Sequence, residues 1–228
     1  IGAKNAVAFD ISAACSGFIY AMSIADQFIR NGTYKTALVI GAEVLSKIID
    51  WSDRNTCVIF GDGAGAVILR GDNGKSGILS THLHTDGSMW DLLYIPGGGS
   101  RYPVSHQMID DKLIYMKMKG NETFKVAVKS LEAVILEAIE HNKMKPSDVN
   151  WIIPHQANLR IIQAVVKRLD IPIERVVLNI ERYGNTSAAS VPMALDEAVR
   201  DGRVKKDDVI IFEAFGAGLP WASALIRW

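Results

Sequence analysis

The chain has 228 residues, enough to bury a large core in one domain or in two fused halves. Its 25 basic and 25 acidic residues give a formal net charge of zero, which argues against a broad nucleic-acid-binding surface. Two cysteines make no disulfide framework, and no apolar run has the length of a membrane span. The composition therefore predicts a cytoplasmic protein that binds neither nucleic acid nor a membrane.

The first third of the chain alternates short apolar runs with one amphipathic stretch. Residues 6–9 read as a buried strand that needs neighbours on both sides. Because the chain opens at Ile1 almost directly into this strand, we expect the protein to begin upstream of it. Apolar spacing predicts a helix over 16–31, and two apolar runs predict buried strands over 36–41 and 64–70.

The remaining two thirds repeat this alternation. A strand over 76–84 opens a second unit, and residues 88–120 read as irregular and partly glycine-rich. We expect helices near 121–141, 156–169 and 187–200, and strands near 149–153, 175–179, 208–213 and 221–227. Alternating strands and helices of this kind indicate an α/β fold.

A faint internal repeat divides the chain. Residues 60–70 are similar to residues 215–227, and the strand before each also matches, 37–43 with 209–214. A period of this length indicates a duplicated domain rather than a solenoid. We therefore predict two halves, residues 1–75 and 76–228, with the first half lacking its opening elements.

Three reactive side chains stand at junctions between a predicted strand and a predicted helix: Cys15, His155 and Asn185. Ligands of open α/β sheets collect at the carboxyl ends of strands, so the three are expected to share one pocket. The start of a helix also favours the thiolate form of cysteine. Taken singly, each residue has a structural alternative. Cys15 could be a small packing residue, His155 could form a local hydrogen bond, and Asn185 could cap a helix.

Three other patterns are set aside. The glycines at 61–65 superficially suggest a dinucleotide loop, but a strand rather than a helix follows them, so close backbone packing explains them better. His82 and His84 share one face of a strand without a third ligand, so no metal site is predicted. No Gly-x-Ser-x-Gly elbow surrounds Ser16, which argues against a serine hydrolase.

Five stretches carry a family resemblance that covers essentially the whole chain. They are Ala13-Ala-Cys-Ser-Gly-Phe18, Asp53-Arg54 with Phe60-Gly-Asp-Gly-Ala-Gly65, Pro154-His-Gln-Ala-Asn-Leu-Arg160, Gly184-Asn-Thr-Ser-Ala-Ala-Ser190 and Glu213-Ala-Phe-Gly-Ala-Gly218. The chain resembles the β-ketoacyl-acyl-carrier-protein synthase III group of thiolase-like condensing enzymes, without roughly the first third of that family's length. The resemblance implies a duplicated five-layer αβαβα architecture, incomplete in its first half here, and a homodimer.

The resemblance also implies a reaction. Cys15 would take the acyl group of an acyl-CoA primer such as acetyl-CoA. His155 and Asn185 would hydrogen-bond the thioester oxygen of malonyl-acyl carrier protein during decarboxylation and condensation, which start fatty-acid synthesis. Replacing His155 or Asn185 with alanine should then spare acyl transfer and impair condensation. No cofactor or metal is implied, because the CoA thioester is a substrate.

Further roles follow from matched positions. The backbone N–H groups of Cys15 and Ala217 would form an oxyanion hole, and Ala217 stands where many relatives have glycine. Arg54 would bind the CoA nucleotide, and Asn121 and Asn158 would bind the pantetheine arm. Phe215 would form a gate at the substrate tunnel, and Ile59 and Phe60 would line the acyl pocket. Carrier-protein contacts would fall on a basic patch of Arg160, Lys125, Lys167 and Arg168. The alternative to a binding role is a solvated surface position for Arg54 and the basic patch. For the apolar residues, the alternative is packing in the core.

Competing interpretations remain open at this point. Elongating condensing enzymes use a second histidine where this chain has Asn185, and plant-type polyketide synthases carry a Gly-Phe-Gly-Pro-Gly turn that is absent here. A related enzyme that primes polyketide or quinolone synthesis fits the same motifs. So does an inactive fragment that needs a preceding segment. The sequence leaves the preferred acyl primer undecided, since pocket shape distinguishes small acyl groups by only about 1–3 kcal/mol.

Overall fold

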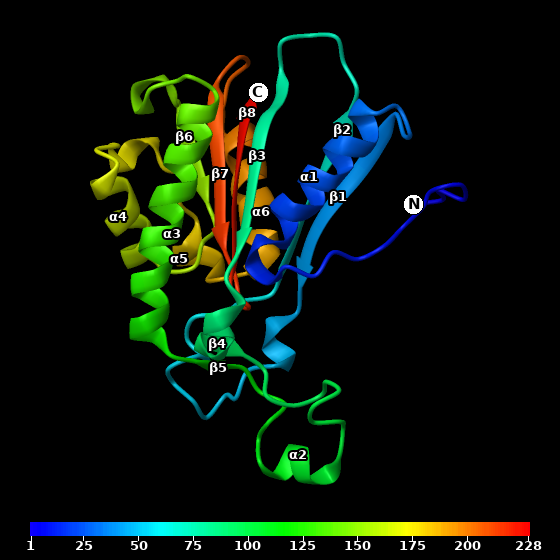
Figure 1. Cartoon of the computed structure of the whole chain (residues 1–228), viewed down its shortest axis with the longest axis vertical. Coiled ribbons are helices and arrows are strands. Elements are labelled where there is room, and N and C mark those ends of the chain that lie inside the picture. The colour runs from blue at the N-terminus through cyan, green and yellow to red at the C-terminus, as the bar shows by residue number, and fades with distance from the viewer.

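A computed structural model describes all 228 residues (Figure 1). Its strands are β1 Thr36–Glu43, β2 Gly63–Arg70, β3 Gly77–Thr85, β4 Leu93–Tyr94, β5 Lys117–Met118, β6 Trp151–Pro154, β7 Val209–Phe215 and β8 Pro220–Arg227. Its α-helices are α1 Gly17–Arg30, α2 His106–Asp110, α3 Gly120–His141, α4 Leu159–Arg168, α5 Ile180–Tyr183 and α6 Ser190–Arg200. No helix is long and apolar enough to span a membrane.

A four-stranded mixed sheet in the order β3-β8-β7-β6 forms the centre of the molecule. Strands β7 and β8 form an antiparallel pair, β3 adds antiparallel to β8, and β6 adds parallel to β7. Every residue of β7 is buried, as expected for a strand covered on both faces.

Helices cover both faces of this sheet (Figure 1). On one face, α3 and α4 pack against Ile152, Ile211 and Leu225 in a core of 21 buried residues. On the other face, α1 and α6 pack against Phe212 and Ala224 in a second core of 19 buried residues. The alternate side chains of β7 therefore enter two different cores, which follows from the period of two along a strand.

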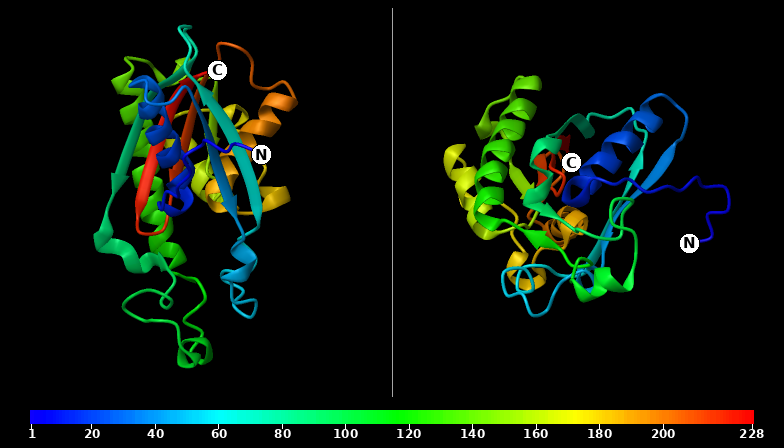
Figure 2. Two further views of the ribbon diagram at one scale, coloured as in Figure 1. Left: turned by 90° about the vertical axis from the view of Figure 1, so that its right-hand side faces the viewer. Right: turned by 60° about the horizontal axis from the view of Figure 1, so that its bottom comes forward.

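Strands β1 and β2 form a separate antiparallel sheet on the far side of α1 and α6, as both views in Figure 2 show. Val39 points inward and is buried, whereas Leu38, Ile40 and Ile68 point outward with 45%, 55% and 72% of their surface exposed. The layers thus run helix, sheet, helix, sheet. The outer face of the fourth layer is apolar and is not covered by any part of this chain.

Glycines allow the fourth layer to approach the helical layer closely. A Cβ atom at Gly41 of β1 would lie 2.3 Å from the carbonyl oxygen of Ala188, just before α6. One at Gly65 of β2 would lie 2.9 Å from the backbone nitrogen of Met193. The sequence interpretation of the 61–65 glycines as close-approach positions is confirmed, and β2 rather than a helix follows them.

Three predictions of secondary structure were wrong. Residues 6–9 form no strand, because no other segment pairs with them, and Val7 and Phe9 are exposed. Strands β1 and β2 exist but are half-buried rather than buried, with alternating exposure. Residues 175–179 make one bridge, between Val176 and Ile152, and no strand.

The last of these errors has a specific cause. The buried amide of Gln156 donates to the Val177 carbonyl at 3.1 Å and accepts from the Asn179 N–H at 3.1 Å. These two hydrogen bonds use the backbone carbonyl and N–H groups that would otherwise pair with a neighbouring strand. The helix predicted over 156–169 does not include Gln156, because it begins at Leu159, where the Asn158 side chain caps it.

Residues 86–119 extend away from the layers as a loosely structured lobe that carries α2 (Figure 1). This agrees with the predicted irregular region. The ammonium group of Lys112 bonds the Asp50 carboxylate at 2.9 Å and ties the lobe to the segment after β1. The lobe, through the β4–β5 pair, brings Leu93 and Met118 to the cavity described next.

Candidate active site

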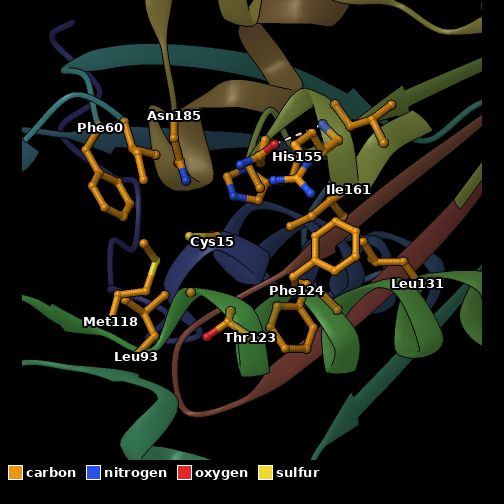
Figure 3. A pocket seen from close by; sticks show the side chains of 18 of the residues that line it. Cys15, Phe60, Leu93, Met118, Thr123, Phe124, Leu131, His155, Ile161 and Asn185 are labelled. Atoms are coloured by element: carbon orange, nitrogen blue, oxygen red, sulfur yellow. Dashed lines mark hydrogen bonds between the residues drawn. The ribbon is translucent and has the colours of Figure 1, made fainter. Parts of the chain in front are cut away.

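Cys15, His155 and Asn185 line one cavity of about 450 Å³. Their side chains point toward one another in Figure 3, although 170 residues of sequence separate the first from the last. All three are buried. The central prediction from the sequence, that these groups share one pocket, is therefore met by their placement.

Cys15 lies in a 3-10 turn, Ala14–Ser16, that leads directly into α1. Ala14 before it has a left-handed backbone with φ of 45°, an unfavourable conformation for a residue other than glycine. A Cβ atom at Gly216 would lie 2.9 Å from the Cys15 nitrogen, so the turn after β7 packs closely against the backbone of Cys15. The strained turn and the close glycine together fix the direction of the thiol.

The protonation state of Cys15 differs from the expectation drawn from the helix start. Burial raises the pKa of the Cys15 thiol to about 11 and outweighs the opposing effect of the nearby Ser187 hydroxyl. At neutral pH the thiol therefore keeps its proton in the free protein. A base must remove this proton before the sulfur can attack a substrate.

His155 follows β6 and is held from two sides. Its backbone N–H donates to the Glu213 carbonyl of β7 at 2.7 Å, and its ring Nδ1 lies 2.7 Å from the Ser190 hydroxyl oxygen. The Ser190 hydroxyl donates its hydrogen to the Ser187 carbonyl at 2.8 Å. Ser190 is thus left as an acceptor, so Nδ1 carries the ring hydrogen and Nε2 has a free lone pair.

Burial lowers the pKa of the His155 imidazole to about 4. The ring is therefore neutral at physiological pH. A neutral imidazole with an unprotonated Nε2 is a proton acceptor. His155 can therefore serve as the base that the buried Cys15 thiol needs.

Asn185 is oriented by its own backbone neighbourhood. Its Oδ1 accepts from the Ser187 N–H at 2.8 Å, which leaves the Nδ2 amide as a donor toward the cavity. Its backbone N–H and C=O bond Ile59 and Gly61, each at 2.9 Å, and so fasten the segment before β2 to this loop. The left-handed backbone of Ser187, with φ of 49°, repeats the strain seen at Ala14.

A carboxylate lies on the far side of the same turn. The Ser187 hydroxyl donates to Glu43 Oε1 at 3.0 Å, at the end of β1. The charge of Glu43 opposes ionisation of Cys15 and adds to the effect of burial. The free pocket thus holds a neutral thiol, a neutral imidazole and an amide donor.

Most of the predicted substrate-binding residues also line the cavity, namely Asn121, Asn158, Phe215, Ile59 and Phe60. Arg160, which was predicted to contact the carrier protein, lines it as well. Arg54 is exposed and does not line it, whereas the adjacent Asn55 does. If Arg54 binds the CoA nucleotide, it does so outside the cavity.

Ala217 does not line the cavity but directly follows Gly216, which contacts the turn of Cys15. Its backbone needs no left-handed conformation; Gly218, with φ of 125°, takes the unusual angle instead. An alanine is therefore compatible with this turn. The oxyanion role of the two backbone N–H groups stays a prediction.

The predicted carrier-protein patch is on the solvent side of α3 and α4. Lys125, Lys167 and Arg168 are exposed, and Arg168 is paired with Glu132. The Arg160 guanidinium lies over the Phe124 ring, 5.7 Å from its centre, at the cavity. The four residues lie on the two neighbouring helices α3 and α4, and their role remains a prediction.

Sequence reasoning missed several lining residues. The apolar ones are Leu93, Met118, Phe124, Ala127, Leu131, Ile161 and Ile162, and the polar ones are Asn55, Thr123 and Glu213. The apolar residues carry no signal that separates them from core packing. Glu213 does carry one, because it is the single charged residue in the otherwise apolar run 209–215.

The histidine pair on β3 has a structural partner. His82 and His84 contact the two oxygens of Glu137 on α3, at 3.2 and 2.6 Å. No group of three or more His, Cys, Asp or Glu side chains is arranged to hold a metal ion. The pair joins β3 to α3 at the surface.

The layered fold and this site define a thiolase-like condensing enzyme, and comparison with known proteins identifies the family. Residues 9–87 match the family model for 3-oxoacyl-[acyl-carrier-protein] synthase III, and residues 139–228 match the model for its C-terminal part. The chain belongs to the β-ketoacyl-acyl-carrier-protein synthase III family.

Individual relatives agree. The chain is 54% identical over its whole length to the β-ketoacyl-acyl-carrier-protein synthase III of Xanthomonas campestris and covers 69% of that protein. The crystal structure of the Aquifex aeolicus synthase III matches with a TM-score of 0.91 and 51% identity, over 99% of this chain and 68% of the other. A priming β-ketosynthase of the R1128 polyketide pathway matches with a TM-score of 0.89 and 37% identity, over 99% and 67%.

Proposed function

We propose that this protein condenses an acyl-CoA primer with malonyl-acyl carrier protein to give 3-ketoacyl-acyl carrier protein, CO₂ and CoA. This reaction would begin fatty-acid synthesis. The observation that carries the proposal is the convergence of Cys15, His155 and Asn185 on one cavity. Membership of the synthase III family supports the same reaction.

The first step is acyl transfer to Cys15. His155 Nε2 accepts the thiol proton, and the sulfur attacks the carbonyl carbon of the acyl-CoA. The bond from this carbon to the CoA sulfur breaks, and the CoA thiolate takes the proton from His155, which returns to the neutral form that its lowered pKa favours. His155 takes up a proton from solvent when the malonyl carboxylate brings its negative charge into the cavity.

The second step is decarboxylative condensation. The carbon–carbon bond to the malonyl carboxylate breaks, and the electron pair forms an enolate whose oxygen accepts hydrogen bonds from Asn185 Nδ2 and protonated His155 Nε2. The enolate carbon attacks the acyl group, and the bond to the Cys15 sulfur breaks. The resulting thiolate recovers its proton from His155.

Other parts of the family pattern complete the proposal. The N–H groups of Cys15 and Ala217 would stabilise the tetrahedral intermediates, Asn121 and Asn158 would bind the pantetheine arm, and Arg54 the nucleotide. The basic residues on α3 and α4 would attract the acidic carrier protein. The enzyme would act as a homodimer in the cytoplasm and would need no separate cofactor.

Priming of polyketide synthesis is a second candidate, because the polyketide ketosynthase has nearly the same fold. Its lower identity makes fatty-acid synthesis the better supported function. Initial rates with acetyl-, isobutyryl- and longer acyl-CoA primers would distinguish the candidates and define the primer.

The decisive experiment separates the two steps. The protein is incubated with radiolabelled acetyl-CoA, the label on Cys15 is measured, and malonyl-acyl carrier protein is then added. We expect labelling in the wild type, none in Cys15→Ala, and label transfer to a 3-ketoacyl product on addition of malonyl-acyl carrier protein. Full condensing activity in all of Cys15→Ala, His155→Ala and Asn185→Ala would rule the proposal out.

A further inference from the structure

Glu213 is a buried carboxyl in the catalytic cavity for which the proposed reaction has no role. It stands in the middle of β7 and is 2% exposed. Its Oε2 atom is buried and has no hydrogen-bond partner, and no cation forms an ion pair with the group. Such groups are rare in folded proteins, and each needs an explanation.

The alternation of β7 sets the direction of this side chain. Ile211 and Phe215, two residues before and after it, pack in the core beneath α3 and α4, whereas Phe212 and Ala214 pack in the other core. Glu213 therefore points toward α3 and α4. It lines the cavity there, as do Phe215 and the α4 residue Ile161.

The surroundings leave the carboxyl without a charge to balance it. The other titratable or charged groups that line the cavity are Cys15, His155 and Arg160, and the Arg160 guanidinium lies over Phe124. The neighbouring strands place Pro154 and Ser223 beside Glu213, and the Ser223 hydroxyl is already bonded to the Val134 carbonyl of α3.

An unbalanced carboxyl in such a place keeps its proton. Burial raises the pKa of Glu213 to about 8, so the neutral acid predominates at physiological pH. A neutral carboxylic acid differs from a carboxylate in having an O–H donor. Enzymes use buried acids of this kind as hydrogen-bond donors to substrate oxygens.

We propose that Glu213 is a substrate-binding residue whose neutral acid group donates a hydrogen bond to a carbonyl oxygen of the thioester arm in this cavity. The inference rests on the proposed function, which brings such an arm into the cavity. Ionisation of Glu213 removes the donor. It also places a negative charge where the malonyl carboxylate must enter, so the ionised form binds malonyl-acyl carrier protein poorly.

Two substitutions of similar size separate the hydrogen bond from packing. Glu213→Gln keeps the shape and an N–H donor but cannot ionise, and Glu213→Met keeps the volume without a donor. At pH 7 we expect kcat/KM for malonyl-acyl carrier protein to fall about 3-fold in Glu213→Gln and about 30-fold in Glu213→Met. Equal losses in both variants would show that Glu213 only fills space.

The pH profile gives the sharper result. Wild-type kcat/KM for malonyl-acyl carrier protein should fall as the pH rises through about 8, the pKa of Glu213. Glu213→Gln should lack this decline. If the wild type condenses and the decline of kcat/KM with pH is also present in Glu213→Gln, the role of Glu213 is overturned and the proposed function remains intact. A wild-type protein that neither labels Cys15 nor condenses overturns the proposed function itself.

Two measurements report on Glu213 without turnover. Infrared spectroscopy should show the carbonyl band of a protonated acid at pH 7 that is missing from Glu213→Gln. The folded protein holds the Glu213 proton between pH 4.5 and about 8 whereas the unfolded chain has lost it, so stability falls as the pH rises across this range. The melting temperature of Glu213→Gln should therefore decrease less than that of the wild type over this pH range. An ionised Glu213 at pH 7, with no such band, contradicts the proposal.

Discussion

His155 Nδ1 lies 2.7 Å from the Ser190 hydroxyl oxygen, and both side chains are buried. The contact joins the residue after β6 to the first residue of α6. Because Ser190 also donates to the Ser187 carbonyl, the contact determines which imidazole nitrogen carries the hydrogen. In the proposed reaction, Ser190 would therefore act through His155, as a positioning residue.

Replacing Ser190 with alanine tests this relationship. Without the acceptor, the ring loses its preferred tautomer, and we expect acyl transfer to fall about 10- to 100-fold. Nitrogen chemical shifts of labelled His155 should show Nδ1 protonated in the wild type and a mixture of tautomers in Ser190→Ala. Ser190→Thr, which keeps the hydroxyl, is the control. An unchanged tautomer in the alanine variant would remove Ser190 from this role.

Asn185 should matter for condensation alone. Its Nδ2 faces the cavity as a donor, so Asn185→Ala should reduce condensation about 100- to 1000-fold while the label on Cys15 is acquired at a nearly normal rate. Asn185→Asp keeps the shape but replaces the donor with an acceptor, and it should be at least as damaging. Recovery of condensation in Asn185→Asp would contradict a donor role.

The buried thiol changes what is expected of His155. The family resemblance alone predicts that His155→Ala spares acyl transfer. Because the pKa of Cys15 is raised to about 11, a base is needed, and we expect His155→Ala to slow acyl transfer about 100-fold or more at pH 7. Labelling of Cys15 by radiolabelled acetyl-CoA measures this directly. A normal labelling rate in His155→Ala would show that the thiol needs no base.

Iodoacetamide provides an independent check of the same thiol. Alkylation of Cys15 should be slow at pH 7 and rise about 10-fold per pH unit toward its pKa, because only the thiolate reacts. The partly exposed Cys57 should react first at neutral pH, and Cys57→Ser isolates the signal of Cys15. Faster alkylation of Cys15 than of Cys57 at pH 7 would mean that the helix start outweighs burial.

Gly41 is expected to support the site although it does not line the cavity of Cys15. An added Cβ atom would lie 2.3 Å from the Ala188 carbonyl oxygen, so Gly41→Ala must push β1 away from the turn that holds Asn185 and Ser187. We expect a loss of about 1–3 kcal/mol in unfolding free energy together with lower activity. Gly87→Ala, which adds a methyl group in open space, is the matched control. Equal stability of the two variants would contradict the packing argument.

The apolar outer face of β1 and β2 should make the protein associate with itself. Leu38, Ile40 and Ile68 together expose a contiguous apolar surface, which favours association. We expect the protein to self-associate in light scattering, and the substitutions Ile40→Lys and Ile68→Lys to reduce the association. A monodisperse wild-type protein would contradict the expectation.

The sequence predicted which side chains share the cavity better than it predicted the strands. Cys15, His155 and Asn185 line one cavity as expected, but only His155 directly follows a strand, β6. The argument from strand ends therefore accounts for His155 and not for the other two. The strand expected over 175–179 failed because the Gln156 side chain bonds its backbone, an interaction that local propensity does not encode. The run at 6–9 failed because an apolar pattern becomes a strand only where another strand pairs with it.

By itself, the sequence determined the α/β class, the order of the main elements and which three polar side chains to expect in one cavity, because these depend on local periodicity and on residue chemistry. Only the tertiary structure decided their protonation and orientation. Burial from distant segments raises the pKa values of Cys15 and Glu213 and lowers that of His155, and the hydroxyl of Ser190 selects the histidine tautomer. These properties arise from desolvation and from hydrogen bonds between residues far apart in the chain, which no local pattern contains.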